Sequence, residues 1–238
     1  MGEFRRFFVE KITNPLVITG EEFNHAVNVL RVKKEQVILV CDNSLYEYLF
    51  KIEEINKKDL VCSLVEKKES QTETKEKVCL ICGYLKGDKT ELVVQKATEL
   101  GVKEIIIFDS KFSSAFFSEN KLLRLKKVAI ESAKQCGRSI VPNINYCNTL
   151  EKALLTCKDY QNKLFACEFA EKGEVKLETL SGSTAIVVGS EGGFSQEEFK
   201  KATELGYKTV YLGKRILRAE TACIALTAII MNALGELE

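Results

Sequence analysis

A segment without a single apolar side chain divides this sequence into two parts with different patterns. The segment covers residues 67–77 and reads K-K-E-S-Q-T-E-T-K-E-K. Such a polar run cannot contribute to a hydrophobic core, so it predicts a linker. Strand patterns dominate before it, whereas strand and helix patterns alternate after it. This change predicts a small β-rich domain followed by an α/β domain.

The part before the linker is predicted to be a small β-barrel domain over residues 1–70. Apolar runs at 37–40 and 60–65 are typical of buried strands. Between them, aromatic or aliphatic side chains recur at every second position over 46–52, which is the pattern of a half-buried strand. One short helix is predicted over 21–30.

The part after the linker, residues 78–238, alternates between strand and helix patterns. This alternation is typical of a mostly parallel sheet with helices on both faces. The hexapeptide K-A-T-E-L-G occurs at 96–101 and again at 201–206, and each copy is predicted to end a helix with its glycine. Strands are expected at 78–83, 104–108, 164–168, 184–189 and 208–212, and helices at about 89–99, 120–135, 149–156, 196–204 and 219–234.

The composition is that of an ordinary globular protein, with 45% apolar and 29% charged residues among 238. No apolar run approaches the roughly 20 residues that a membrane span needs. The N-terminus lacks the apolar core of a signal peptide. We therefore expect a cytoplasmic protein with no membrane partner.

The nine cysteines are predicted to be free thiols that behave as small apolar side chains in a reducing compartment. Cys79 and Cys82 form a lone C-x-x-C motif. Zinc would need two more ligands, and His25, the only histidine, is far away in the sequence. A buried strand is therefore the favoured interpretation, and no metal is expected.

The net charge of +1 does not indicate a nucleic-acid partner. Any RNA-binding surface would have to be a local basic patch, and each basic cluster taken alone is more typical of a solvated surface. The candidate clusters are Arg5 and Arg6, then Arg31, Lys33 and Lys34, then Lys126, Lys127, Lys134 and Arg138.

Two glycine-bearing turns near the C-terminal end predict a ligand site. The first reads G-S-E-G-G-F-S from Gly189, and the second is L-G-K-R from Leu212. Each follows an apolar strand pattern and leads into a predicted helix, and Ser195 and Glu198 form a capping box for the first helix. Turns at the carboxyl ends of neighbouring parallel strands meet at one crevice.

The nature of the ligand follows from the residues in these turns. Glycines let the backbone approach a ligand closely, and such turns often bind phosphate. However, the phosphate motifs G-x-x-x-x-G-K-[ST] and G-x-G-x-x-G are absent, and Glu191 would repel phosphate. A small polar or cationic ligand fits better. Either turn alone is more typical of an ordinary connection, but the pair, together with Lys214, Arg215 and Arg218, favours a site.

The stretch that holds both turns resembles the signature of the RsmE family, because G-S-E-G-G-F-S is followed by L-G-K-R-I-L-R-A-E-T-A. Other family-like elements come in the expected order: R-R-F-F-V at 5–9, H-A-V-N-V-L-R at 25–31, K-A-T-E-L-G-V at 96–102 and Q-C-G-R at 135–138. The resemblance covers essentially the whole chain, and its last motif pair is the most specific.

The resemblance implies an enzyme of the SPOUT superfamily that uses S-adenosylmethionine to methylate N3 of a uridine in 16S ribosomal RNA of the small subunit. It implies a trefoil knot in the parallel sheet and a PUA-like fold for the first domain. It also implies a homodimer through the last helix. The sequence from Ala222 to Met231 is apolar nearly all round, which predicts a helix buried in a large core or at an oligomer interface.

The proposed reaction needs a group that favours loss of the N3 proton, because the attacking lone pair appears only on deprotonation. An arginine beside the uracil carbonyl oxygens would stabilise the anion. Arg218 is the first candidate and Arg138 the second, and a phosphate contact or surface ion pair is the alternative for each. Glu220 is a candidate to accept a proton or orient an arginine, or it satisfies the dipole of the last helix. The sequence identifies no general base.

The resemblance also implies residues for the other contacts. Ser190 stands where the family usually has proline, which predicts a less rigid turn and a lower cofactor affinity. The RNA contacts, mainly to phosphate, are Arg5, Arg6, His25, Arg31 and Lys33. The cofactor contacts are Phe165, Ala166, Glu168, Gly189, Glu191, Gly192, Gly193, Leu212, Gly213, Ile216, Leu217, Arg218 and Thr221.

Three other functions compete with this one. A SPOUT enzyme for another RNA would share the cofactor turns and differ in its N-terminal domain. A non-catalytic RNA-binding module would use the crevice structurally or would have lost the cofactor. A phosphotransferase is disfavoured, because a P-loop and a pair of metal-binding carboxylates at recognisable spacing are missing.

Overall fold

The computed structural model describes residues 4–112, 117–167, 175, 177 and 180–237. The chain forms two compact units. The first is Met1–Glu73 together with Ala133–Val141, and the second is Thr74–Ser132 together with Pro142–Glu238. The boundary at residue 73 lies inside the segment without apolar residues. The return of Ala133–Val141 to the first unit differs from the predicted domain bounds.

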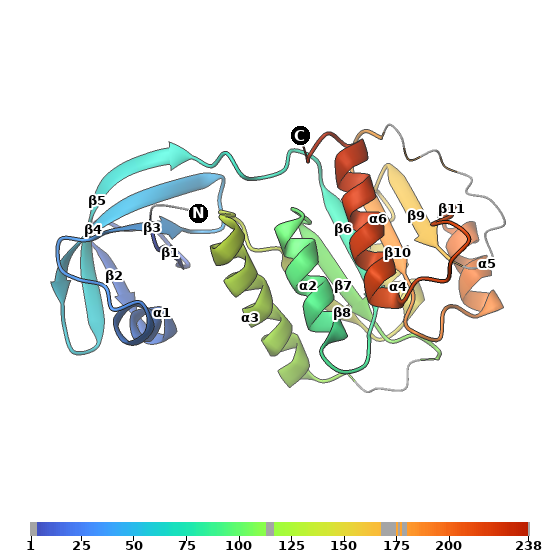
Figure 1. Ribbon diagram of the computed structural model, residues 1–238, viewed down its shortest axis with the longest axis horizontal. Helices are drawn as coiled ribbons and strands as arrows, with labels where there is room; N and C mark the ends of the chain where they lie inside the picture. The colour runs from blue at the N-terminus through green and yellow to red at the C-terminus, as the bar shows by residue number, and fades with distance from the viewer. Residues whose placement is uncertain (1–3, 113–116, 168–174, 176, 178–179, 238) are drawn as a thin grey trace. The chain divides into compact units, whose positions relative to one another are not determined.

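A five-stranded sheet forms the first unit (Figure 1). Its strand order is β1-β3-β4-β5-β2; β1 pairs in parallel with β3, and the other pairs are antiparallel. Two register shifts between β4 and β5 increase the local bend and curl the sheet. The strands are β1 (Arg6–Phe8), β2 (Leu16–Thr19), β3 (Val37–Cys41), β4 (Tyr46–Ile55) and β5 (Asp59–Glu69).

The main core of the first unit lies on one face of this curled sheet, and a smaller buried cluster holds Leu39, Cys41 and Leu49. Phe7, Phe50 and Leu60 are fully buried in the main core, and Phe23 of the short helix α1 (Gly20–Asn24) packs with them. The alternating side chains of β4 and its neighbours fill this face, as the period-2 pattern predicts. The result is a curled half-barrel, which agrees with the predicted small barrel domain.

The helix predicted over 21–30 is two elements. A π-helical turn over His25–Val29 follows α1, and the amide of Leu30 donates a hydrogen bond to the carbonyl of His25 at 3.0 Å. Arg31 then has φ +52°, in the left-handed region. This backbone conformation ends the helical segment and leads the chain into β3.

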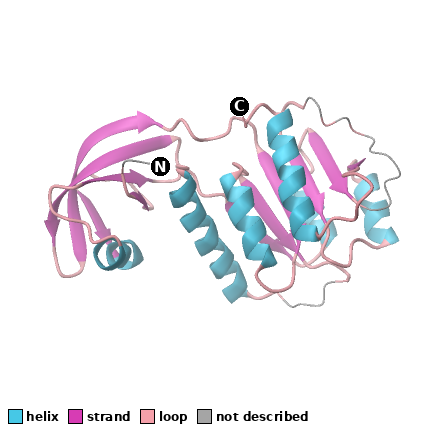
Figure 2. Ribbon diagram, in the orientation of Figure 1, coloured by secondary structure: helices cyan, strands magenta, loops and turns pink. Residues whose placement is uncertain are grey.

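A six-stranded, fully parallel sheet forms the centre of the second unit, with the order β11-β9-β10-β6-β7-β8. Figure 2 shows the helices of this unit flanking its strands. The strands are β6 (Val78–Gly83), β7 (Glu104–Phe108), β8 (Asn143–Cys147), β9 (Asn162–Ala166), β10 (Thr184–Val188) and β11 (Lys208–Val210). The helices are α2 (Lys89–Glu99), α3 (Glu119–Cys136), α4 (Leu150–Thr156), α5 (Gln196–Glu204) and α6 (Ala219–Ala233).

Helices cover both faces of this sheet, as predicted. Cys79 and other residues of one face pack with α4 and α5. Cys82 points to the opposite face, where its sulfur lies 3.4 Å from that of Cys223 in α6. α2 packs against α6 (Figure 1). Because Cys79 and Cys82 face opposite sides of β6, the two thiols belong to the buried strand and cannot ligate one metal ion.

The two K-A-T-E-L-G copies end α2 and α5 as predicted. Gly101 and Gly206 have φ +90° and +80°, and each lies two residues beyond the last helical residue. Their conformation lets the following amide bond back to the last turn of the helix. The predicted capping box of Ser195 and Glu198 at the start of α5 is also confirmed.

The sequence patterns miss β1, β2 and β8. The last of these is an edge strand that pairs only with β7, and in its sequence N-I-N-Y-C only Ile144 is fully buried. A half-exposed edge strand needs no continuous apolar run, so its pattern is weak. β9 begins and ends two residues before the predicted 164–168. The trefoil knot implied by the resemblance stays a prediction.

Candidate active site

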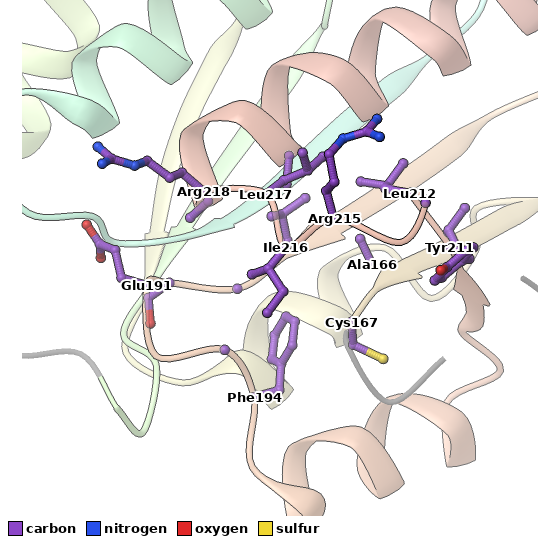
Figure 3. A pocket seen from close by; sticks show the side chains of 18 of the residues that line it. Ala166, Cys167, Glu191, Phe194, Tyr211, Leu212, Arg215, Ile216, Leu217 and Arg218 are labelled. Carbon is purple, nitrogen blue, oxygen red and sulfur yellow. The ribbon is translucent and has the colours of Figure 1, made fainter. Parts of the chain in front are cut away.

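A cavity of about 530 Å³ lies in the second unit at the carboxyl ends of three parallel strands. Val188 of β10 and Val210 of β11 both pair with Ala166 of β9, so the three strands end at one level. The carboxyl end of β9, at Ala166 and Cys167, and the turns after β10 and β11 line the cavity (Figure 3). We call it the three-turn pocket. This is the edge at which open parallel sheets bind ligands.

The turn after β10, residues 189–194, forms one wall of the pocket. The amide of Gly193 donates to the carbonyl of Ser190 at 3.0 Å, and Gly193 has φ +66°. Gly83, at the end of β6, supports this turn from behind, because a Cβ placed there would lie 2.4 Å from the Ser190 nitrogen. Glycine at position 83 therefore lets the turn lie directly against the end of the neighbouring strand.

The turn after β11, residues 211–218, forms the opposite wall. Gly213 has φ +96° and gives the turn its reversal. Ile216 lines the pocket although its side chain is 98% exposed, so the protein itself leaves this apolar side chain almost uncovered. Arg218 ends the turn at the N-cap of α6, and its carbonyl accepts a hydrogen bond from Ala222 at 2.8 Å.

The guanidinium of Arg218 is exposed and has no hydrogen-bond or ion-pair partner within the part of the chain that the structure describes. Figure 3 shows the side chains of Arg215 and Arg218 leaving the turn in different directions. An unpaired guanidinium beside a pocket is available to a ligand, because no intramolecular ion pair has to be broken first.

Lys89 and Glu191 line the pocket, and Glu220 lies beside Lys89. Lys89 Nζ is 3.0 Å from Glu191 Oε1 and 3.7 Å from Glu220 Oε2. Glu191 Oε1 also accepts the Lys86 amide at 3.2 Å. Burial opposes ionisation of Glu191, but the hydrogen bonds from Lys89 and from backbone amides outweigh it and lower the pKa of this carboxyl. Glu191 is therefore a carboxylate at neutral pH.

Comparison with known proteins identifies the family. The ribosomal RNA small subunit methyltransferase E of Mesomycoplasma hyopneumoniae is 37% identical over 225 residues, which cover 93% of this chain and 96% of that protein. The protein of the same name from Bacillus subtilis is 32% identical over 244 residues, with 94% and 95% covered. The chain belongs to the RsmE family.

Family models and a solved structure agree with this membership. A model described as an RNA methyltransferase domain matches residues 72–231, and one described as an RNA methyltransferase PUA domain matches residues 18–65. The ribosomal RNA small subunit methyltransferase E of Neisseria gonorrhoeae, solved bound to S-adenosyl methionine, is similar to this chain with a TM-score of 0.84. The sequence identity is 25%, and the alignment covers 97% of this chain and 98% of that one.

Most of the cofactor residues implied by the RsmE resemblance come together at the three-turn pocket. Phe165 is instead buried below it and packs on the ring of Phe194, 4.2 Å between centroids. Gly192 and Thr221 belong to the same chain segments without lining the cavity. Glu168 lies outside the described residues. Those that line the pocket are Ala166, Gly189, Glu191, Gly193, Leu212, Gly213, Ile216, Leu217 and Arg218.

Several lining residues were not predicted. Lys89 comes from the start of α2, more than 100 positions before the turns, and nothing in its local sequence marks it as part of the site. Phe194 closes the turn after β10, and its position within G-S-E-G-G-F-S was a usable signal. Lys214 and Arg215, which the sequence already associated with a site, also line the pocket. The remaining lining residues that were not predicted are Cys167, Val188, Ser190, Val210, Tyr211, Ala219 and Ala222.

Of the three catalytic candidates, Arg218 lines the pocket and Glu220 follows it in the first turn of α6. Arg138 does not line the pocket. It belongs to the first unit, where its guanidinium is buried against the carboxylate of Glu73 at 2.9 Å, with 3% and 2% of the two side chains exposed. This burial argues against a catalytic Arg138, because a guanidinium already enclosed by a carboxylate is not available to a uracil.

The five predicted RNA contacts all lie in the first unit but differ in exposure. Arg5, Arg31 and Lys33 are exposed. Arg6 is largely enclosed by an ion pair with Glu47 at 2.8 Å, which favours a structural role over a phosphate contact.

The fifth candidate, His25, is half-buried. Its Nδ1 lies 3.5 Å from the ammonium of Lys134, which itself pairs with Glu22 at 2.7 Å. The ring of Phe7 is 6.4 Å from that of His25, centroid to centroid. These neighbours account for the position of the imidazole without a ligand.

Among the described residues, no cluster of three or more His, Cys, Asp or Glu side chains has a geometry that could hold a metal ion. Within the same residues, no helix is long and apolar enough to cross a membrane.

Proposed function

We propose that this protein uses S-adenosylmethionine to methylate ribosomal RNA of the small subunit, at N3 of a specific uridine in 16S RNA. The observation that carries the proposal is the three-turn pocket of an RsmE-family chain, with the unpaired Arg218 at its edge. The homologues named ribosomal RNA small subunit methyltransferase E support the RNA class. The relative solved with S-adenosyl methionine supports the cofactor. Ribosomal RNA as substrate places the proposed activity in the cytoplasm.

The residues of the pocket fit such a cofactor. Its volume of about 530 Å³ is within the range of roughly 300–1,000 Å³ usual for small-molecule sites. Ile216 offers an uncovered apolar surface for a purine, and Gly189 and Gly193 leave the backbone accessible. Ser190 Oγ is buried without a hydrogen-bond partner among the described residues, so a polar ligand atom would satisfy it.

The cofactor, when bound, supplies a methyl group on a positively charged sulfur. Glu191 lines the pocket and would offer that cation a negative charge, and it shares the ammonium of Lys89 with Glu220. Lys214, Arg215 and Arg218 line the same pocket, so a ligand there meets charged groups of both signs.

Arg218 has the position and the freedom to stabilise the uracil anion. Its planar guanidinium presents several N–H donors, which match the two carbonyl oxygens that flank N3 of uracil. Donors that are already in place when negative charge develops lower the barrier. Because Arg218 caps the start of α6 and has no intramolecular partner in the described chain, its side chain can face the substrate without losing an ion pair.

Glu220 is the group that we assign to receive the N3 proton. Its side chain is 13% exposed, and Oε2 is buried without a hydrogen-bond donor among the described residues. The ammonium of Lys89 is the nearest cation at 3.7 Å, beyond hydrogen-bond distance. A buried carboxylate oxygen with a vacant lone pair is suited to accept a proton from a donor that enters the pocket.

The test is methyl transfer to purified small ribosomal subunits that lack the modification, with labelled S-adenosylmethionine, followed by primer extension. N3 methylation blocks Watson–Crick pairing, so we expect one cofactor-dependent stop of reverse transcriptase near the 3′ end of the RNA. Label incorporated without such a stop would move the target to another atom or another RNA. Absence of cofactor binding would support the non-catalytic RNA-binding module instead.

We propose that exposed basic side chains of the first unit bind the phosphates of the RNA substrate. Arg5, Arg31 and Lys33 are the exposed cations among the predicted contacts. Phosphate contacts position an RNA without reading its sequence, so they account for orientation and not for the choice of uridine. Arg6 is not part of this proposal because Glu47 neutralises it.

We also propose a homodimer through α6. Cys223, Leu226 and Ile230 face the core of the second unit, whereas Ile224 is only partly buried and Ile229 is 41% exposed. A helix that remains apolar on its outer side is typical of an interface.

Ile229→Asp is expected to convert the dimer to a monomer, because the new carboxylate would be desolvated in the apolar interface. Light scattering after size-exclusion chromatography measures the change. Leu155→Asp is the matched control, since Leu155 is equally exposed on α4 and should leave the mass unchanged. A wild-type protein that is already monomeric would contradict the proposed interface.

A further inference from the structure

Lys89 connects three chain segments at the edge of the three-turn pocket. It is the first residue of α2, and its ammonium contacts Glu191 in the turn after β10 and Glu220 in the first turn of α6. The two distances are 3.0 Å and 3.7 Å, and all three side chains are at least half-buried. Partly buried charges interact more strongly than exposed ones, because water screens them less.

The stability of α2 does not explain a lysine at this position. The N-terminus of a helix carries a partial positive charge, so a cation in the first turn is unfavourable there. The same turn already has Glu91, the type of residue that the helix dipole favours. The ammonium of Lys89 is therefore held at the unfavourable end of its own helix by carboxylates that belong to other segments.

The two carboxylates belong to different chain segments, Glu191 to the turn after β10 and Glu220 to the first turn of α6. Glu191 accepts hydrogen bonds from Lys89 and from the Lys86 amide. These bonds attach the end of the β6–α2 connection to the turn after β10. Glu220 lies two residues after Arg218, so its placement fixes the start of α6 beside the proposed catalytic guanidinium. Without the ammonium between them, the two like charges would repel each other at the pocket wall.

We propose that Lys89 is a positioning residue that holds Glu191 and Glu220 at a fixed separation, and through them sets both the cofactor-binding turn and the catalytic end of α6. The proposal rests on the function proposed above, since it assigns Lys89 a role in the same site. It predicts that the loss of one ammonium group affects cofactor affinity and the rate of transfer together. A contact from Lys89 to RNA would affect only the Michaelis constant for RNA.

The test compares Lys89→Met with Lys89→Arg. Met keeps the length of the stem and a good helix former but removes the charge, whereas Arg restores a cation that can reach both carboxylates. Cofactor affinity is measured by isothermal titration calorimetry without RNA. The transfer rate is measured in single turnovers on unmodified small subunits at saturating cofactor, and thermal unfolding by circular dichroism confirms that each variant folds.

We expect Lys89→Met to weaken cofactor binding and slow transfer by about tenfold each, the size of one lost charged hydrogen bond. Lys89→Arg should restore most of both. Lys111→Met is the matched control, because Lys111 makes a shorter ion pair, 2.7 Å to Glu197, whose side chains are 55% and 84% exposed and do not line the three-turn pocket. It should change neither quantity.

Three outcomes decide the proposal. Unchanged cofactor affinity and transfer rate in Lys89→Met, with a raised Michaelis constant for RNA, would overturn it in favour of an RNA contact. A wild-type protein that binds the cofactor but does not methylate small subunits would overturn the proposed function, while the affinity loss in Lys89→Met would still support the positioning role. A wild-type protein that binds no cofactor would overturn both.

Discussion

Replacing Arg218 with alanine should lower the rate constant of methyl transfer by about 10²–10³-fold, the usual cost of removing one preorganised donor that stabilises a developing anion. The guanidinium lines the pocket and has no competing partner among the described residues. Single-turnover transfer to unmodified small subunits measures the rate constant. Calorimetry should show that cofactor affinity is largely retained, because the implied cofactor contacts of this turn come mainly from its backbone.

Two further variants separate the role of Arg218 from that of positive charge in general. Arg218→Lys keeps the charge but loses the planar fork, so it should recover only a small part of the rate. Arg215→Ala removes a cation from the same turn and should retain most of the wild-type rate constant of transfer. Equal losses in Arg215→Ala and Arg218→Ala would assign both side chains to general RNA attraction. Turnover at the wild-type rate by Arg218→Ala would contradict the catalytic role proposed for Arg218.

Most of the second unit was predicted correctly because its strands, helices and turns are each marked by a pattern of neighbouring residues. The apolar strands and the amphipathic helices each carry their own periodicity, and both K-A-T-E-L-G copies place glycine at the residue where the helix must end. The turns after β10 and β11 were recognisable for the same reason, since glycines and a capping box mark them within a few residues. Parallel pairing then brings these local features to one edge of the sheet.

The features that the sequence did not predict depend on contacts between residues that are far apart in the sequence. Lys89 joins the site only because β6 lies beside β10 in the sheet, an order that no local pattern states. The need for glycine at position 83 likewise appears only when its neighbour across the sheet is known. The return of Ala133–Val141 to the first unit cannot be seen in a helix pattern that runs unbroken through residue 136.

Arg138 shows how a motif residue can be misassigned when its partner is distant in sequence. Glu73 was interpreted as part of a polar linker, and Arg138 as a candidate near the substrate. In the structure Glu73 accepts from the Arg138 guanidinium and also from the amides of Ser139 and Ile140, each at 2.9 Å. Gly137, with φ +84°, turns the chain at the end of α3 so that these groups meet. The linker is thus anchored by a buried ion pair.

Glu73→Ala should therefore destabilise the protein by about 3–5 kcal/mol, because it leaves the Arg138 charge buried and unpaired. The loss of the acceptor for two backbone amides adds to this cost. Urea unfolding followed by far-ultraviolet circular dichroism measures the change. Glu35→Ala is the matched control, since it removes an exposed partner of Lys51 and should cost at most about 1 kcal/mol.

The same variant decides between the two roles of Arg138. A structural role predicts that the folded fraction of Glu73→Ala transfers methyl groups at nearly the wild-type rate constant, measured at low temperature where the variant is folded. A catalytic role predicts the opposite combination, in which the free energy of unfolding barely changes and the rate constant falls. The bidentate burial of Arg138 against Glu73, with 3% of the arginine side chain exposed, leads us to expect the first result.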